Sequence, residues 1–294
     1  FIKNLIKNKN SPLLLNAPTG SGKSLIFYTC AVIMKVFQPN ENGTKVFVAY
    51  PTRALNTDQF GRLVELFYHL NKNGIKISIG LYMGGNRRKR GVGLLKTISP
   101  LGRPQQIVEG SYLSDQIAMC PNCEGTEIIG HKQYENRIVP ICTKCKEELS
   151  FVYLSSDEVQ SYCPNIVIAT SDKLGQGLSY STFSHAMFGA PSKMCPKCGY
   201  YLILNKKNQK EDIHTCRCGN ANLDAKTLTR SEPCMTIFDE IHSISGMHGN
   251  LLGQFLSLMK KTSELYGSTT KYWFMGATAT LVNRAEIVSN LTGE

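Results

Sequence analysis

The chain has 294 residues, of which 42% are hydrophobic and 9% aromatic, so it can bury a core, and wholesale disorder is excluded. Its formal net charge of +11 favours a polyanionic partner, and no apolar stretch reaches the ~18 residues of a membrane span. Eight of the eleven cysteines fall in close pairs, which is typical of metal binding, whereas secreted disulfide scaffolds are usually short chains. Because the chain begins at Phe1 and not at Met, we expect a segment of a longer protein.

Short apolar runs alternate with helical patterns along the chain. The runs predict strands at residues 13–16, 45–50, 75–81, 165–170, 235–238 and 272–275. Apolar residues at helical spacing predict helices at 22–37, 53–71, 248–266 and 283–291. This order is typical of an α/β domain with a parallel sheet, helices on both faces and right-handed crossovers.

Two polar, turn-rich stretches interrupt the alternation, and we interpret them as insertions into one domain. The domain is predicted at residues 1–85, 161–188 and 231–294, and the insertions at 86–160 and 189–230. The first insertion carries a basic run without an acidic residue, made of Arg87, Arg88, Lys89, Arg90, Lys96 and Arg103. The run suits a nucleic-acid groove or a solvated, mobile loop, and both interpretations stay open.

Residues 17–24 read APTGSGKS, between an apolar run and a helical pattern. Their two glycines allow backbone amides to curl around phosphate oxygens at a helix N-terminus. Lys23 suits the neutralisation of β- and γ-phosphate charge, and Ser24 offers a hydroxyl to Mg²⁺. Ala17 stands where the generic pattern has Gly. The segment predicts a nucleotide-binding phosphate loop.

Residues 237–242 read IFDEIH at the end of a predicted strand. Asp239 suits a water-mediated contact to Mg²⁺, and Glu240 suits the orientation and deprotonation of an attacking water. His242 is placed to link the nucleotide site to a second domain. An Asp-Glu pair after a strand is weak alone, but together with the phosphate loop it predicts a phosphoryl-transfer site.

Six segments in a fixed order carry a family resemblance: APTGSGKS (17–24), PTRAL (51–55), the glycine pair at 84–85, ATSDKL (169–174), DEIH (239–242) and GATAT (276–280). They resemble motifs I, Ia, GG, Ib/Ic, II and III of superfamily 2 DExH-box helicases, in which Ala17 is ordinary. YPTRALNTDQ (50–59) is especially similar to the Lhr/YprA-like branch of DNA helicases, and some anti-phage helicases look similar. The resemblance implies a RecA-like P-loop domain, and the spacing of the cysteines described below predicts that its two small insertions are zinc-ribbon-like.

The resemblance also implies roles for individual residues. ATP would be bound by Pro18, Thr19, Gly20, Ser21, Gly22, Lys23 and Ser24. The catalytic group would be Lys23, Asp239, Glu240 and His242, with Ser24 and Asp239 as the magnesium ligands. The nucleic-acid backbone would contact Pro51, Thr52, Arg53, Gly84, Gly85, Thr170, Ser171 and Asp172. Nucleotide state would be coupled to strand movement by Thr278, Ala279 and Thr280. Ser171 stands where the family commonly has Pro.

The family's motor contains a second RecA-like domain with arginine fingers, and we expect that domain to lie outside these 294 residues. An arginine finger contributes orders of magnitude in rate. We therefore expect the isolated chain to bind ATP weakly and to hydrolyse it slowly.

The cysteine pairs form two sets with zinc-ligand spacing. The first set is Cys120, Cys123, Cys142 and Cys145, and the second is Cys195, Cys198, Cys216 and Cys218. Four thiolates close a tetrahedron and leave no position for water, so both sites are predicted to be structural.

Several alternatives remain at these sites. His214 is an alternative ligand in the second set, the pairs of the two sets could share one metal, and an iron–sulfur cluster is a further option. Cys30, Cys163 and Cys234 lie in apolar contexts and are predicted to be ordinary buried thiols. Tyr112, Tyr134 and Tyr153 suit stacking on bases or simple cover of a small ribbon.

We therefore expect the motor domain of an ATP-dependent nucleic-acid helicase or translocase, with ATP, Mg²⁺ and two structural Zn²⁺ as cofactors. The branch resemblance implies DNA more than RNA as the polymer. The alternative is an ATP-gated nucleic-acid-binding scaffold in a larger complex, for example in anti-phage defence, without unwinding. Expected partners are nucleic acid, a second RecA-like domain and other protein subunits, with no membrane. Reduced, paired thiols and the absence of targeting signals favour the cytoplasm.

Overall fold

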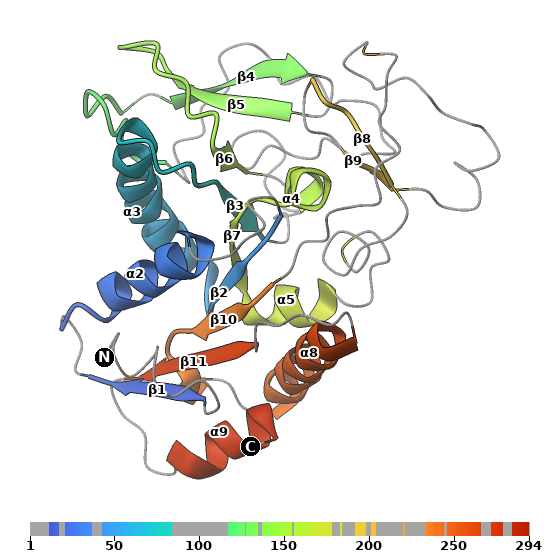
Figure 1. Cartoon of the computed structure of the whole chain (residues 1–294). Coiled ribbons are helices and arrows are strands. Elements are labelled where there is room, and N and C mark those ends of the chain that lie inside the picture. Colours follow the sequence, from blue (N-terminus) through green and yellow to red (C-terminus); the bar gives the residue numbers. More distant parts are fainter. Residues whose placement is uncertain are drawn as a thin grey trace.

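Seven parallel strands form the central sheet, in the order β1-β11-β10-β2-β7-β3-β6 (Figure 1). Their bounds are β1 Leu13–Asn16, β2 Val46–Tyr50, β3 Ile79–Tyr82, β6 Val152–Tyr153, β7 Ile166–Thr170, β10 Met235–Phe238 and β11 Trp273–Thr278. The computed structural model describes residues 12–17, 21–36, 43–83, 117–126, 128–134, 137–154, 156–177, 183, 192–197, 201–203, 220, 233–243, 246–265, 272–278 and 284–293. The expected α/β, RecA-like fold with a parallel sheet is confirmed.

Helices cover both faces of the sheet (Figure 1). One face carries α2 (Lys23–Val36) and α3 (Arg53–Lys72). The other carries α4 (Ser156–Tyr162), α5 (Ser171–Gly177), α8 (Gly246–Leu265) and α9 (Arg284–Thr292), with a short 3-10 helix, η1 (Ile241–Ser243), between β10 and α8. None of the described helices is both long enough and apolar enough to traverse a bilayer.

Side chains of β2 alternate between the two hydrophobic clusters that hold these layers together. Val46, Val48 and Tyr50 join the α2–α3 side, whereas Phe47 and Ala49 join the opposite side. All five are fully buried, which explains why the strand appears in the sequence as an unbroken apolar run.

Strand β3 is shorter than the alternating pattern at 75–81 predicts, because it begins only at Ile79. The Asn71 side chain donates to the Ile77 carbonyl at 2.8 Å and accepts from the Ile77 amide at 3.3 Å. The Asn165 side chain accepts from the Ser78 amide at 3.0 Å. The side-chain amides of Asn71 and Asn165 therefore bond the backbone groups that a neighbouring strand would otherwise bond.

Elements absent from the sequence prediction lie in and around the cysteine-rich stretches. Two antiparallel hairpins form there, β4 (Ile128–Tyr134) with β5 (Arg137–Cys142), and β8 (Ser192–Met194) with β9 (Tyr201–Ile203). The two-residue strand β6 falls inside the range expected for the first insertion, yet it pairs with β3 at the edge of the main sheet. A strand of two residues is too short to leave a periodic signal.

Candidate active site and metal centre

The carboxyl ends of the central strands meet at one edge of the sheet and bring the predicted phosphate loop to the acidic segment. The Ala17 amide donates to the Thr278 carbonyl at 3.3 Å, so the β1–β11 ladder continues by one bond. The Asp239 amide donates to the Ala49 carbonyl at 3.1 Å and extends the β10–β2 ladder in the same way. This edge is where open α/β sheets bind their ligands.

Lys23 opens helix α2 and lies beneath this edge, only 7% exposed. Gly22 before it has a φ of +82°, a conformation that glycine adopts readily and that turns the loop into the helix. Among the described residues, the Lys23 ammonium has no hydrogen-bond acceptor, and its ion pair joins Nζ to Glu240 Oε1 at 3.7 Å. A buried cation with so little compensation fits a site for an anion.

Glu240 has an unusual backbone, with a φ of +52° in the left-handed region. Its carbonyl accepts from the Ser243 amide at 2.9 Å and from the Ser243 hydroxyl at 2.8 Å. A non-glycine residue in this region costs on the order of 1 kcal/mol, and such strain clusters at functional sites. The conformation places one carboxylate oxygen near Lys23 and the other near His242.

The His242 ring joins the acidic segment to strand β11. Its Nδ1 lies 3.2 Å from Glu240 Oε2 and 3.0 Å from Thr278 Oγ1. The structure thus brings together three residues that the sequence assigned to catalysis and coupling. One imidazole nitrogen therefore lies within contact distance of both the Glu240 carboxylate and the Thr278 hydroxyl.

Asp239 is buried beside a second carboxylate. Burial raises the pKa of Asp239 above its ordinary value, the charge of Glu240 raises it further, and Lys23 opposes the shift. The Glu240 amide donates to Asp239 Oδ1 at 3.0 Å and fixes the direction of the carboxylate. A divalent cation would relieve the repulsion between the two acids.

These groups fit Mg²⁺ and a nucleoside triphosphate. Lys23 and the first amides of α2 would hold the β- and γ-phosphates, and no atom of the described residues lies within 4 Å of the position that a Cβ on Gly22 would take. Ser24 and Asp239 would hold Mg²⁺, which supplies neutralisation of phosphate charge. Ser21 precedes them, whereas Pro18, Thr19 and Gly20 lie outside the described residues.

Two of the segments predicted to bind nucleic acid follow neighbouring strands of the sheet, β2 and β7, and each leads into a helix. Tyr50 of β2 lies opposite Thr170 of β7 in the parallel ladder, so the segments 51–53 and 170–172 are side by side. The Thr52 hydroxyl caps α3 by accepting from the Leu55 amide at 3.3 Å, and the Thr170 hydroxyl accepts from the Lys173 amide at 3.4 Å. Two adjacent helix N-termini suit backbone phosphates.

The other residues predicted to contact nucleic acid differ in how far they are exposed. Pro51 is partly buried, Arg53 is exposed and Asp172 is partly buried, whereas Ser171 is buried as the first residue of α5. Gly84, Gly85, Ala279, Thr280 and the basic run of 86–108 lie outside the described residues.

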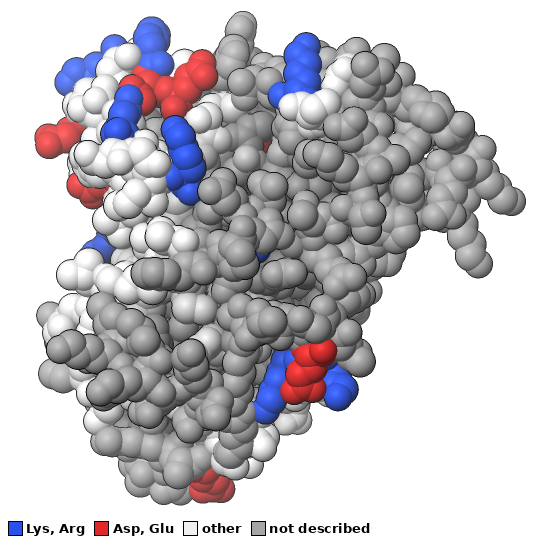
Figure 2. Space-filling view, in the orientation of Figure 1, with Lys and Arg blue, Asp and Glu red and all other residues white. Residues whose placement is uncertain are grey.

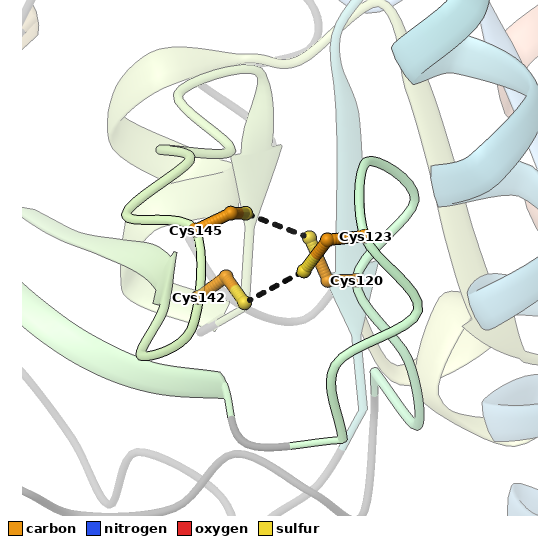
Figure 3. Close-up of side chains that lie close together, drawn as sticks. All are labelled: Cys120, Cys123, Cys142 and Cys145. Atoms are coloured by element: carbon orange, nitrogen blue, oxygen red, sulfur yellow. Dashed lines mark hydrogen bonds between the residues drawn. The ribbon is translucent and has the colours of Figure 1, made fainter.

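The first cysteine set converges on one point (Figure 3). All four sulfurs lie within 4.8 Å of one another, with Cys120 Sγ 3.6 Å from Cys145 Sγ and Cys123 Sγ 3.6 Å from Cys142 Sγ. Four sulfurs held at about 2.3 Å by a tetrahedral ion lie about 3.8 Å apart, whereas a disulfide joins sulfurs at about 2 Å. The geometry fits a tetrahedral zinc ion. The convergence of these four thiols favours a metal bound within the first set over a metal shared between the two sets.

The surroundings shift the pKa values of two thiols of the first set in opposite directions. Burial raises the pKa of Cys120 to about 12, while the Asn122 side chain and the Glu147 amide lower the pKa of Cys145 to about 6. In the second set Cys195 is buried and accepts from the Asn220 side chain at 3.5 Å. Its partners Cys198, Cys216 and Cys218, and the alternative ligand His214, lie outside the described residues.

The metal centre packs on the RecA-like core. Cys120 and Cys142 belong to the same hydrophobic cluster as α2 and α3. Lys72 of α3 forms a 3.0 Å ion pair with Glu147 and lies 5.2 Å above the Tyr68 ring. Figure 2 shows described basic and acidic side chains mixed in this region, so they do not form a patch of one sign on the face drawn.

The remaining thiols and aromatic residues are mostly structural. Cys30, Cys163 and Cys234 are buried as predicted. Tyr153 packs on Tyr162 with ring centroids 5.4 Å apart, which favours cover over base stacking. Tyr112 and the side chain of Tyr134 lie outside the described residues.

Sequence reasoning missed one polar group beside the site. The Tyr28 hydroxyl lies 3.2 Å from the Tyr50 hydroxyl and also donates to Gln59. The signal was available, since Tyr28 follows Ser24 by one helical turn and therefore shares its face.

Comparison with known proteins finds similarity to helicases. Residues 1–108 match the DEAD/DEAH box helicase family. The chain is 30% identical over 221 residues to the probable ATP-dependent RNA helicase pitchoune of Drosophila melanogaster, covering 70% of this chain and 32% of that protein. It is 38% identical over 217 residues to human ATP-dependent RNA helicase DDX18, covering 68% and 31%. The chain thus spans about a third of the length of these relatives.

Solved structures of the DUF1998 helicase MrfA share the fold. One matches with a TM-score of 0.50 at 15% identity and covers 98% of this chain and 27% of that one. Another, of MrfA bound to DNA, matches with a TM-score of 0.50 at 17% identity and covers 99% and 23%. At such identity the likeness supports the RecA-like architecture alone.

Proposed function

Because this chain contains a DEAD/DEAH box helicase domain, we propose that it is the motor domain of an ATP-dependent helicase that couples ATP hydrolysis to movement along a nucleic acid. One observation carries the proposal. A buried, under-compensated Lys23 ammonium faces the Asp239–Glu240 pair, and His242 joins Glu240 to Thr278. Phosphate binding, hydrolysis and a mechanical output therefore share one connected group.

In the proposed reaction, Lys23 and the α2 amides bind and orient the phosphates. Ser24 and Asp239 hold Mg²⁺, which neutralises charge that develops on the γ-phosphoryl group. Glu240 accepts the proton of the attacking water at a carboxylate oxygen and orients the water for in-line attack. In the structure Glu240 contacts Lys23 instead, so its carboxylate must be released as phosphate takes its place.

The output of the reaction passes through the imidazole. His242 Nδ1 is within hydrogen-bonding distance of both Glu240 and Thr278, so a change in the charge at Glu240 changes which oxygen it contacts. Thr278, with Ala279 and Thr280, would carry that change toward the second RecA-like domain, which supplies arginine fingers.

We propose DNA as the polymer. Support comes from the resemblance of residues 50–59 to the Lhr/YprA-like branch and from the shared fold with MrfA, which has been solved bound to DNA. The curated relatives are named RNA helicases, so RNA is the alternative substrate for the test. Pro51, Thr52, Arg53, Gly84, Gly85, Thr170, Ser171 and Asp172 would contact the strand.

The cysteine sets complete the proposed domain as two structural zinc modules, inserted at 86–160 and 189–230. Support for the first is the converged four-thiol cluster, and support for the second is its ligand spacing. All-cysteine sites and reduced buried thiols suit the cytoplasm, where we propose the protein acts.

The test is ATP turnover by the full-length protein and its Glu240→Gln variant, measured without polymer, with single-stranded DNA and with RNA. Stimulation by DNA above RNA, lost in the variant, is the expected result. Stimulation by RNA alone would mean that the substrate is RNA and not DNA. Binding of polymer with no stimulation by either one would favour the second candidate, an ATP-gated scaffold. The intact Lys23, Asp239 and Glu240 argue against a protein that has lost ATP hydrolysis, but they are compatible with a clamp that ATP closes.

A further inference from the structure

The end of strand β3 is held from helix α4. Strands β3 and β7 are parallel neighbours in the sheet (Figure 1), and Tyr82 is the last residue of β3. The Tyr82 hydroxyl accepts a hydrogen bond from the Gln160 side chain of α4 at 3.3 Å. The next carbonyl along the chain, that of Met83, accepts from the hydroxyl of Ser156, the first residue of α4, at 3.2 Å. The Tyr82 ring stacks on Phe183 with ring centroids 4.9 Å apart.

Helix α5 contacts the same ring with a lysine. The Lys173 ammonium lies over the Tyr82 ring, 4.8 Å from its centroid. Tyr82 is fully buried and Lys173 is partly buried, so water screens this cation–π contact only in part. The Lys173 amide also donates to the Thr170 hydroxyl at 3.4 Å. Lys173 therefore contacts the ends of two neighbouring strands, β3 through its side chain and β7 through its backbone.

The position of Lys173 in its helix gives this contact a purpose. Lys173 lies in the first turn of α5, where the helix dipole favours an acid such as Asp172 and disfavours a positive charge. The attraction of the Tyr82 ring offsets that cost. The lysine is therefore explained by what it holds at the sheet edge, and not by a gain in helix stability.

The contact joins two segments that are proposed to bind nucleic acid. Lys173 directly follows the segment 170–172, and Tyr82 precedes Gly84 by two residues. Two segments that bind the same strand must be held at a fixed separation. Any ordering that is not present before binding is paid during binding and reduces the affinity.

We propose that Lys173 is a positioning residue, which clamps the end of β3 to α5 and so fixes the separation between two segments that bind the sugar-phosphate backbone. The inference rests on the proposed function. Because the Tyr82 ring engages its ammonium, Lys173 acts through Tyr82 and is not itself a phosphate contact.

The test is binding of a fluorescent single-stranded DNA, and of the matching RNA, to the full-length protein over a range of salt concentrations. Lys173→Met removes the charge and keeps most of the length of the side chain, and it should weaken binding of the preferred polymer about 5- to 10-fold. Lys173→Arg should restore most of the affinity, since a guanidinium also stacks on an aromatic face. The slope of log affinity against log salt should stay the same in Lys173→Met, whereas loss of a direct phosphate contact would reduce it by about 0.7.

Lys72→Met is the matched control. Lys72 also lies over an aromatic ring, that of Tyr68 at 5.2 Å, but at the opposite end of α3 from Thr52. The control removes the same charge and should lower the melting temperature without changing polymer affinity. Hydrogen exchange without polymer adds a second readout, because amides at the end of β3 should exchange faster in Lys173→Met and at the wild-type rate in Lys72→Met.

The outcomes separate the inference from the proposed function. Unchanged polymer affinity or unchanged exchange at the end of β3 in Lys173→Met would mean that the inference is wrong, and so would an equal loss of affinity in Lys72→Met. A shallower salt slope in Lys173→Met would make Lys173 a phosphate contact and would also overturn it. All of these results leave the proposed function intact, whereas a wild type that binds neither polymer would remove both.

Discussion

In the structure the Glu240 carboxylate lies beside the same lysine that must bind phosphate. The ion pair joins Lys23 Nζ to Glu240 Oε1 at 3.7 Å, and the Asp239 carboxylate also attracts the buried ammonium. Phosphate therefore competes with Glu240 for Lys23. The substitution Glu240→Gln removes the competitor and keeps the shape of the side chain, so it should tighten nucleotide binding while it stops hydrolysis.

The size of the effect follows from the separation. Two unit charges 3.7 Å apart attract by about 4 kcal/mol at an effective dielectric constant of about 20, and by about 1 kcal/mol in water. The Glu240 side chain is 26% exposed, so solvent screens the pair and the lower end applies. A difference of about 1–2 kcal/mol corresponds to nucleotide binding roughly 10-fold tighter in the variant.

The assay is titration of a fluorescent ATP analogue into wild type and Glu240→Gln at low and moderate salt, with ATP turnover measured in parallel. Melting temperatures add a second readout, since the variant should be less stable without nucleotide and gain more stability when nucleotide is added. Glu264→Gln is the control for net charge, because Glu264 pairs with Lys261 on the exposed side of α8. It should leave nucleotide affinity unchanged.

Equal or weaker nucleotide binding by Glu240→Gln would refute this reasoning. It would mean that the carboxylate contributes more by holding the site in shape than it costs by occupying Lys23. A similar gain in Glu264→Gln would instead assign the effect to the net charge of the whole protein.

Three further predictions follow from the same geometry. Cys142→Ser should release one zinc ion per chain and lower the melting temperature by several degrees, because Cys142 lies in the main hydrophobic cluster as well as at the metal centre; metal analysis and thermal unfolding check it. Asp239→Asn should stabilise the nucleotide-free protein at neutral pH, where burial and Glu240 penalise the wild-type carboxylate, and the gain should shrink as pH falls through the raised pKa of Asp239 and the wild type becomes neutral; melting temperatures across pH measure this. Gly276→Ala should cost about 1–3 kcal/mol in chemical denaturation, because the new Cβ would lie 2.9 Å from Ile241 Cδ1.

The strand–helix alternation and the phosphate-site edge could be predicted because each depends on local signals. A strand buried on both faces is apolar throughout, as β2 is, and the phosphate loop has its own glycines and lysine. The meeting of residues 23, 239, 240 and 278 then follows from parallel topology, which puts carboxyl ends on one edge.

The features that could not be predicted from the sequence depend mostly on contacts between side chains of distant segments. The start of β3 is set by amides at Asn71 and Asn165, which compete with a strand for the same backbone groups. The Tyr28 group joins residues from three elements, and polar residues in an apolar face look like exceptions until their partners are known. The left-handed conformation of Glu240 has no signal in the sequence, since a non-glycine residue gives no indication that its φ will be positive.

The strand order has a consequence for how the protein is made. Strand β1 pairs with β11, and β10 lies between β11 and β2. Leu13 of β1 can therefore form its strand pairing only after Met275 of β11 has been synthesised. Such long sequence separation slows folding and leaves apolar strands uncovered during synthesis. On the ribosome, β2, β7 and β3 can pair early, whereas β1 stays open to proteases and chaperones until the last strand emerges. Nascent chains stalled before residue 233 should therefore be cut near β1, and chains extended past residue 278 and clear of the exit tunnel should be protected there.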